Sequence, residues 1–477
     1  MTAALPRFLP ASAEIFVLIM VCVVMLTSVF TKKKGSNLSF YLTQLTLVGA
    51  AWLTWSSYVG EPSYAFYGSY VLDRLAVILK LFICFTSFLV FTYSRYYVRD
   101  RQMAFNENYI LGLLAVLGML VVVSGNNLLI LYLGLELMSL PIYAMVALQR
   151  NNTRAVEAAM KYFVIGALAS GMLLYGLSMI FGATRSLDIS TIYHVVQHMP
   201  AATSMLLVFG LVFVLAGLAF KLGAAPFHMW VPDVYDGAPT SVTLFIGTAP
   251  KLAAFGLVVR LLVDAMPAMS AQWSHVLIVM SLLSMSLGNI MAISQTNIKR
   301  MLAYSSIAHM GYMLLGLACA TPDGESAALF YMISYTIMTM AAFAMVIMVG
   351  QKADVSSIEE FAGLNSRNPW LAFMLLIVMF SMAGIPPIVG FMAKLSVLEA
   401  LIQVHMVWLA VVALLFAIIG SYYYIRVVKV MYFDEPHVDS KIICPKDLQV
   451  AISFNGMVVL ALGIFPGFLF TMTHLVF

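Results

Sequence analysis

Long apolar runs without charged residues limit most strongly what this chain can fold into. Each run is about 20 residues long, the length that an α-helix needs to cross the hydrocarbon core of a bilayer. Of the 477 residues, 62% are hydrophobic and 10% are charged. A soluble protein has about 45–50% apolar and about 25% charged residues. The excess cannot be buried in a water-soluble fold, so the sequence predicts an integral membrane protein. The strands of a transmembrane β-barrel would be about 10 residues long and alternate in polarity, which these runs do not.

The runs predict an all-α polytopic membrane protein that forms a single membrane domain over residues 1–477. We expect fourteen spanning helices, which begin near positions 12, 38, 72, 108, 127, 158, 203, 240, 274, 300, 325, 369, 406 and 449. The first run, about 14–30, is followed by three lysines, whereas a signal peptide carries its positive charge before the run. We therefore expect a first spanning helix, with both chain termini on the outer side of the membrane.

The distribution of basic residues supports this orientation, because cytoplasmic loops of membrane proteins carry an excess of Lys and Arg. Of the 25 basic residues, 16 fall on the predicted cytoplasmic side, 4 on the outer side and 5 within candidate helices. The cytoplasmic set is Lys32, Lys33, Lys34, Arg95, Arg99, Arg101, Arg150, Arg154, Lys299, Arg300, Lys352, Arg367, Arg426, Lys429, Lys441 and Lys446. The outer set is Arg7, Arg74, Arg185 and Arg260.

The sequence shows no motif for a redox or nucleotide cofactor. Cys22, Cys84, Cys319 and Cys444 are scattered singly, which excludes a disulfide framework, a CxxC pair and a cysteine-ligated Fe–S cluster. There is no Walker A loop, and no GxGxxG opens a helix after a strand. The net charge of +4 is too small to indicate nucleic acid. We expect no cofactor in this chain.

A metal site in the polar stretch 184–200 is weakly indicated. His194 and His198 lie four residues apart there, but no carboxylate or cysteine accompanies them as a further ligand. The pattern favours a water-exposed amphipathic segment.

Two apolar runs are interrupted by Gly and Pro. Residues 221–232 read KLGAAPFHMWVP, and residues 383–394 read AGIPPIVGFMAK. Proline removes a helical hydrogen bond, and the carbonyls that it frees are tolerated at membrane depth only where protein or water satisfies them. Each interruption has a lysine beside it, Lys221 or Lys394. A simple packing kink, the alternative, would need no lysine.

An internal repeat is a further hypothesis. At an offset of 169 residues, Tyr143 falls on Tyr312, Tyr162 on Tyr331, and the pair Ala158–Ala159 on another Ala–Ala pair. The offset corresponds to five helices, an odd number, so the two copies would be inverted in the membrane. Inverted repeats with interrupted helices are a common plan of transporters.

Five lysines lie within candidate helices: Lys80, Lys161, Lys221, Lys251 and Lys394. An ionisable residue inside a spanning helix costs about 2.5–3.5 kcal/mol on insertion scales and is a functional-site candidate. Lys251 is the strongest candidate, because it lies near the middle of its span. For Lys80, function and snorkelling to the interface remain open. Lys161 lies near a helix end and is a weaker functional candidate.

Glu136 and two histidines complete the candidate site. Glu136 is centred in an apolar span, and a buried lysine nearby would let it ionise, so that the pair titrates as a unit. His228 and His309 either relay protons or hydrogen-bond within the bundle. A buried lysine can exchange a proton at physiological pH, whereas Na⁺ or K⁺ would favour carboxylates and carbonyls as ligands. The excess of lysine therefore favours proton transport.

At these residues the chain resembles the antiporter-like membrane subunits of respiratory complex I. The matching motifs are PFHMWVPDVYDGAP within 221–251, SQTNIKRMLAYSSIAHMGY at 294–312, LELMSLP around Glu136, and AGIPPIVGFMAK, which ends at Lys394. The similarity covers nearly the whole chain. A lysine rather than a glutamate at 394 differs from subunit M and from the Mrp-type antiporter subunit of this family, and the length differs from subunit L.

The resemblance implies a fold of about fourteen helices with two inverted five-helix repeats. Helices 4–8 (about 108–264) would form the first repeat and helices 9–13 (about 274–433) the second, with helices 7 and 12 broken. It also implies that Glu136 pairs with Lys221, that Lys251 is the central relay and that Lys394 serves the exit half. Lys161 matches a further lysine of the family.

The partners implied by the resemblance are other membrane and peripheral subunits of an NADH–quinone oxidoreductase in a bacterial inner membrane. Those subunits would carry FMN and Fe–S clusters, and this chain would move protons in response to their chemistry. Two alternatives remain open. A self-standing cation/proton antiporter would transport ions as an isolated chain, whereas a structural subunit with inert lysines would tolerate the loss of Lys251.

Overall fold

The computed structural model describes residues 8–30, 37–101, 103, 105–198, 201–350, 356–436, 442 and 445–477, with the backbone alone at 201–204. Seven residues considered above lie outside this part of the chain: Arg7, Lys32, Lys33, Lys34, Lys352, Lys441 and Cys444.

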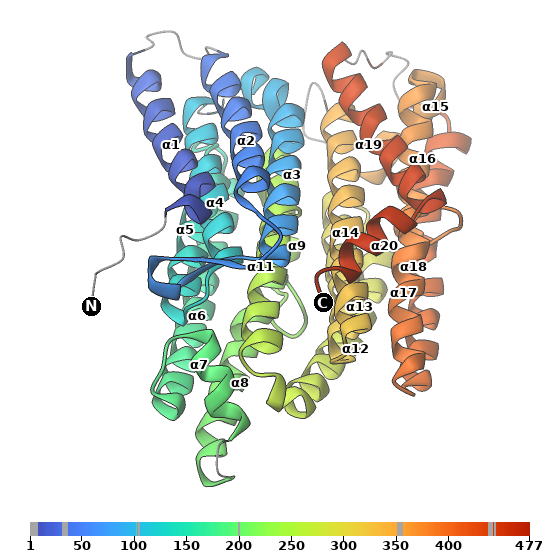
Figure 1. Ribbon diagram of the computed structural model, residues 1–477. Helices are drawn as coiled ribbons and strands as arrows, with labels where there is room; N and C mark the ends of the chain where they lie inside the picture. The colour runs from blue at the N-terminus through green and yellow to red at the C-terminus, as the bar shows by residue number, and fades with distance from the viewer. Residues whose placement is uncertain are drawn as a thin grey trace. The chain divides into compact units, whose positions relative to one another are not determined.

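Nearly all of the described chain is helical, as expected from the apolar runs (Figure 1). The α-helices are α1 (Ser12–Phe30), α2 (Leu38–Ser57), α3 (Arg74–Asp100), α4 (Phe105–Ser124), α5 (Leu128–Val146), α6 (Thr153–Thr184), α7 (Ile189–Gln197), α8 (Ala201–Leu222), α9 (Trp230–Gly237), α10 (Thr240–Ile246), α11 (Ala249–Val258), α12 (Ser270–Ile293), α13 (Ile298–Ala318), α14 (Pro322–Val349), α15 (Leu364–Arg367), α16 (Pro369–Ala383), α17 (Val389–Gln403), α18 (Val407–Phe433), α19 (Lys446–Ile464) and α20 (Gly467–His474).

Short elements connect several of these helices. The 3₁₀ turns are η1 (Leu9–Ala11), η2 (Phe66–Gly68), η4 (Pro267–Met269) and η5 (Ile358–Phe361), and the π-helix is η3 (Val259–Asp264). Strands β1 (Ser63–Ala65) and β2 (Tyr70–Leu72) form an antiparallel hairpin between α2 and α3.

Twelve helical segments of the described chain are long and apolar enough to span a membrane. The remaining two predicted starts fall in α2 and α16. α2 has 20 residues but buries the polar side chains of Thr43, Gln44 and Thr46. α16 ends after 15 residues. The chain is therefore a multi-pass helical membrane protein, and the count of fourteen stays a prediction.

The chain forms two compact units. The first contains residues 1–91, 98–221 and 249–273. In it, α1 packs along α2, and α4 packs against α1, α5 and α11. The second unit contains residues 92–97, 222–248 and 274–477, and in it α14 packs against α13, α16 and α17. α13 and α14 are buried over almost their whole length.

Both predicted interruptions are present. α8 ends at Leu222, and Gly223 follows with φ +73°, in the left-handed region that favours glycine. α16 ends at Ala383, and Gly384 caps it with φ +88°. Each interruption contains a cis X–Pro bond, Ala225–Pro226 or Pro386–Pro387. A short connection then leads to the next helix, α9 or α17.

Candidate functional site

Lys221 is linked to α5, the helix that carries Glu136, through hydroxyl groups. Its Nζ donates to Ser139 Oγ at 2.8 Å and to Tyr143 Oη at 3.4 Å. Glu136 lies one turn before Ser139 and accepts a hydrogen bond from Ser170 Oγ of α6. Among the described residues, no ion pair joins Glu136 directly to Lys221. The two groups are thus brought to the same stretch of α5, and their pairing stays a prediction.

Lys161 does not point into the bundle. Its side chain is 45% exposed on α6, and its Nζ forms an ion pair with Glu157 Oε1 at 2.9 Å, one helical turn earlier. The structure therefore separates Lys161 from the hydroxyl cluster around Lys221. Its assignment to the proton path stays a prediction.

Lys251 is 1% exposed and lies in α11, within a segment, Thr240–Asp264, that is buried along its whole spanning window. Pro250 precedes it in the first turn of α11, where a backbone N–H would have no partner within the helix, so the proline is tolerated there. Because the segment is buried along its whole spanning window, this lysine has no route to an interface by snorkelling.

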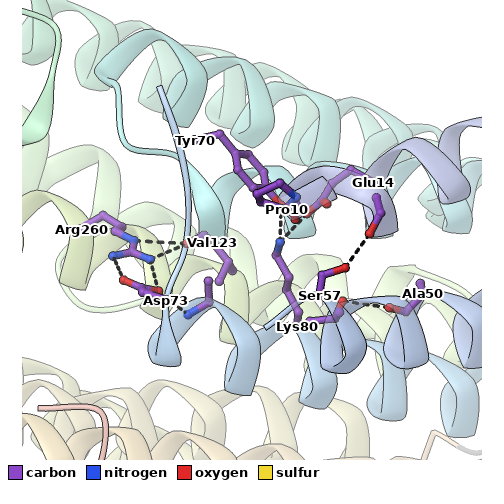
Figure 2. Close-up of polar contacts among 12 residues, drawn as sticks. Pro10, Glu14, Ala50, Ser57, Tyr70, Asp73, Lys80, Val123 and Arg260 are labelled. Atoms are coloured by element: carbon purple, nitrogen blue, oxygen red, sulfur yellow. Dashed lines mark hydrogen bonds and ion pairs between the residues drawn. The ribbon is translucent and has the colours of Figure 1, made fainter. Parts of the chain in front are cut away.

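The helix of Lys251 is anchored at its far end by Arg260 in the π-helix η3 (Figure 2). Arg260 donates to Asp73 through two bonds of 2.7 Å, to Asp264 Oδ2 at 2.9 Å and to the Val123 carbonyl through two bonds of 3.2 Å. All five guanidinium N–H groups therefore have acceptors. Burial alone would raise the pKa of Asp73, but the charge and hydrogen bonds of Arg260 hold that pKa below its usual value. Arg260, counted above among the outer basic residues, is a buried helix residue.

Lys394 in α17 is held by the carbonyls that the helix break frees. Its Nζ donates to Ala383 O at 2.8 Å and to Met382 O at 3.2 Å. These are the last carbonyls of α16, which have no donor within the helix and lie at its partially negative end. The Nζ also lies 5.4 Å from the centre of the Tyr312 ring. The break thus builds a cation site for the lysine that follows it.

His309 lies at the centre of a hydroxyl network in the second unit. It is 3% exposed on α13, with Nδ1 at 2.7 Å from Tyr331 Oη and Nε2 at 3.1 Å from Tyr424 Oη. His309 and Lys394 line the same small cavity, together with Asn289. Its volume of about 10 Å³ matches about one water molecule, and its lining supplies several polar partners. The cavity therefore brings His309 and Lys394 to the same small polar space.

His228, predicted together with His309, is placed differently. It lies in the turn between α8 and α9, is only partly buried, and its backbone carbonyl accepts from Val231 N at 2.9 Å. Its Nδ1 has no hydrogen-bond partner among the described residues. The relay role of His228 stays a prediction.

Lys80 forms a second buried cluster in the first unit, shown in Figure 2. Its side chain is fully buried, its Nζ lies 2.6 Å from Glu14 Oε1 of α1, and it donates to Tyr70 Oη at 2.5 Å. Tyr70 in turn donates to the Pro10 carbonyl at 3.2 Å. Because the ammonium group is buried and paired, snorkelling is excluded. The cluster ties α1 and the β hairpin to α3.

Sequence reasoning missed the partners that complete these sites: Glu14, Asp73, Ser139, Ser170 and Tyr424. Tyr143 and Tyr331 carried a signal, since both belong to the repeat at an offset of 169 residues. Glu14 also carried one, because it stands at the start of an apolar run. The others are common residue types in helices, and nothing in their spacing marks them.

His194 and His198 belong to α7 and its C-terminal end, where His198 Nδ1 lies 3.2 Å from the His194 carbonyl. α7 buries Ile189, Ile192 and Val196 on one face, so the amphipathic interpretation is confirmed. Within the described ranges, no group of three or more His, Cys, Asp or Glu is arranged to hold a metal.

Comparison with known proteins gives a consistent result. Residues 125–420 match the family described as NADH:quinone oxidoreductase/Mrp antiporter, TM. NADH-quinone oxidoreductase subunit N of Coxiella burnetii is 58% identical over 100% of both chains. The subunit N of Thioalkalivibrio sulfidiphilus is 49% identical over 99% of this chain and 98% of the relative.

Solved structures with a similar fold point to the same family as these relatives. A chain of respiratory complex I from Thermus thermophilus with bound Aureothin is 31% identical, with a TM-score of 0.83 over 96% of this chain and 98% of that one. A chain of the Mrp complex from Dietzia shares the fold at 20% identity, with a TM-score of 0.88 over 98% and 97% of the two chains. The fold and the buried lysines thus define an antiporter-like membrane subunit. The chain belongs to the NADH:quinone oxidoreductase/Mrp antiporter family, in its subunit N branch.

Proposed function

We propose that this chain translocates protons as a membrane subunit of a bacterial NADH-quinone oxidoreductase. The full-length relatives that carry this name support the assignment. Electron transfer from NADH to quinone takes place in partner subunits, which hold the FMN and the Fe–S clusters. This chain supplies protonatable groups across the bilayer, in the inner membrane and with both termini on the outer side.

One observation carries the proposal: lysines within the membrane-spanning helices lie at helix breaks and contact groups able to pass a proton. In the first unit, Lys221 contacts the hydroxyls of Ser139 and Tyr143. In the second, Lys394 shares a cavity with His309. Hydroxyl and imidazole groups both donate and accept, so they can pass a proton without leaving their places.

The sites take different roles in this mechanism. Glu136 holds the charge of Lys221 through the hydroxyls of α5, Lys251 is the central relay, and His309 hands protons to Lys394 through the small cavity. Two positive charges about 7 Å apart at an effective dielectric of about 20 repel by about 2.4 kcal/mol. A charge that arrives on His309 would therefore weaken the hold of Lys394 on its proton more than tenfold. Lys161 and His228 are further members of this proposed path.

The repeat also belongs to this proposal, with residues about 108–264 and 274–433 as its two copies. Its support is that the paired tyrosines are in contact in both units. The rings of Tyr143 and Tyr162 meet edge to face at 4.6 Å, whereas those of their counterparts Tyr312 and Tyr331 are stacked at 5.9 Å. Each pair therefore forms one contact in its own unit.

Replacement of Lys251 by Ala tests the proposal. Inverted membrane vesicles with matched amounts of complex should show a loss of at least tenfold in proton uptake driven by NADH. Lys429→Ala, which removes an exposed lysine of α18, is the control and should pump normally. Normal pumping by the Lys251→Ala complex would show that Lys251 is not the central relay. Ion transport by the isolated wild-type chain would instead support the antiporter alternative, which the subunit N relatives do not favour.

A further inference from the structure

A groove at one end of the first unit combines an apolar lining with two opposite charges. Its volume is about 490 Å³, within the range of about 300–1,000 Å³ that is usual for small-molecule sites. Apolar side chains line it from α1, α4 and the end of α5, and they include Met25, Ile110, Leu111 and Leu148. Glu107 and Arg150 supply its charges.

The groove lies at the level where spanning helices end. Met25 is five residues before the end of α1, and Leu111 is six residues after the start of α4. Leu148 and Arg150 lie between α5 and α6. With a rise of 1.5 Å per residue, the lining reaches about 9 Å inward from the helix ends. This is the depth of a lipid headgroup with the first part of its acyl chains.

Both charged side chains at the groove are exposed, and the described part of the chain offers neither of them a partner. Neither Glu107 nor Arg150 forms a hydrogen bond or an ion pair with its side chain to another described residue. Next to the groove, α1 presents the exposed apolar side chains of Leu26, Val29 and Phe30, which a bilayer would cover. A ligand for this groove therefore has an apolar body, an anionic group for Arg150 and a cationic group for Glu107.

We propose that this groove is a binding site for a phospholipid whose headgroup carries both a phosphate and a primary ammonium group, as phosphatidylethanolamine does. The Arg150 guanidinium forms paired hydrogen bonds with the phosphate oxygens, a geometry for which its planar fork is suited. The Glu107 carboxylate accepts from the ammonium group. The acyl chains cover Met25, Ile110 and Leu111. An anionic lipid satisfies Arg150 alone and meets repulsion from Glu107, which gives the site its headgroup preference.

Photocrosslinking tests the site in the intact complex. The complex is exchanged into nanodiscs that contain a phosphatidylethanolamine with a diazirine in the acyl chain, and crosslinked peptides are identified by mass spectrometry. We expect labelling of the α1 and α4 peptides that contain Met25 and Leu111. Unlabelled phosphatidylethanolamine should compete at least fivefold better than phosphatidylglycerol or phosphatidylcholine.

Three variants and a control separate headgroup recognition from simple contact with the bilayer. Arg150→Gln should lower this labelling at least fivefold. Glu107→Gln should reverse the preference toward phosphatidylglycerol. Leu111→Trp should block labelling with any headgroup by filling the groove. Arg154→Gln, at an exposed arginine of the first turn of α6 that does not line the groove, should leave it unchanged.

Two results would overturn the proposal. Equal competition by the three lipids, with no effect of Arg150→Gln, would show ordinary contact with bulk lipid. Absence of labelling in the wild-type complex, together with a crosslink from this groove to a partner subunit, would show that protein fills it. Because binding is measured without turnover, neither result depends on the proton-translocating function proposed above.

Discussion

Lys221 and Lys394 occupy comparable places in the two units but are held by different chemical groups. Each lies beside a helix break that contains a cis X–Pro bond. Each also places its Nζ over a tyrosine ring, at 5.8 Å from the centre of Tyr143 or 5.4 Å from the centre of Tyr312. These two tyrosines are 169 residues apart in the sequence.

The hydrogen-bond partners of the two lysines set them apart. Lys221 is partly buried and bonds to side-chain hydroxyls, which can rotate and exchange donor and acceptor roles. Lys394 is buried and bonds to two backbone carbonyls, which only accept and cannot move without the helix. Position 221 is therefore suited to an adjustable charge beside Glu136, whereas position 394 requires a group of one shape that donates hydrogen bonds and can release its proton.

Replacement of each lysine by arginine should have the largest effect, because it separates the need for a positive charge at 221 from the need for a group that can release its proton at 394. Lys394→Arg should lower NADH-driven proton pumping at least tenfold, because a guanidinium stays charged and the cavity of about 10 Å³ cannot take its larger head. Lys221→Arg should keep at least about a third of the pumping, since its site is partly exposed and needs only positive charge. Proton uptake in vesicles at matched complex content measures both. Equal losses in the two variants would show that both lysines must titrate.

Alanine at the two capping glycines should show how closely the break and the lysine are joined. A Cβ at Gly384 would lie 3.0 Å from Lys394 Nζ, whereas a Cβ at Gly223 would meet Val231 Cγ2 at 2.7 Å and no lysine. Both changes force a left-handed backbone on alanine, at a cost of about 1–2 kcal/mol. Thermal unfolding of the purified complex should therefore shift in both variants.

Pumping per assembled complex should distinguish the glycine variants, with a loss of about three- to tenfold for Gly384→Ala alone. A displaced Lys394 loses bonds that contribute about 0.5–1.5 kcal/mol each, which sets this range. If Gly223→Ala impairs pumping to the same degree, the effect arises from backbone strain and not from the lysine.

A double-mutant cycle should measure the connection between Glu136 and Lys221. We expect Glu136→Gln and Lys221→Gln to lower pumping by overlapping amounts, with a coupling of about 0.5–1.5 kcal/mol, because the groups communicate through hydroxyls and not in direct contact. Pumping rates of the two single variants and the double variant supply the coupling. Strict additivity would mean that the two residues do not share a site.

The helices and the breaks could be predicted from the sequence because both depend on local chemistry. Apolar runs of spanning length favour a helix wherever they occur, and Gly with Pro at 383–387 ends one whatever surrounds it. The contacts of Lys80 and Arg260 could not be predicted, because their partners Glu14 and Asp73 lie 66 and 187 residues away. Only packing of distant helices decides such pairs. The break before Lys394 could be predicted from the sequence. The carbonyls that contact the lysine could not, because they depend on the residue at which α16 ends.

The smallest effects should come from phenylalanine at the two ring tyrosines, and they should differ in kind. Tyr143 Oη accepts a long bond of 3.4 Å from Lys221, so Tyr143→Phe should lower pumping by about twofold, at the weak end of hydrogen-bond contributions. Tyr312 Oη instead donates to the Ala413 carbonyl at 3.0 Å and gives Lys394 only its ring, which phenylalanine retains. Tyr312→Phe should leave pumping unchanged while it lowers the thermal stability of the complex by about 0.5–1.5 kcal/mol, since a buried hydrogen bond between α13 and α18 is lost. Pumping and thermal unfolding of the two variants, measured side by side, decide the comparison. A pumping defect in Tyr312→Phe that exceeds that of Tyr143→Phe would show that the hydroxyl of the second unit, and not that of the first, takes part in proton transfer.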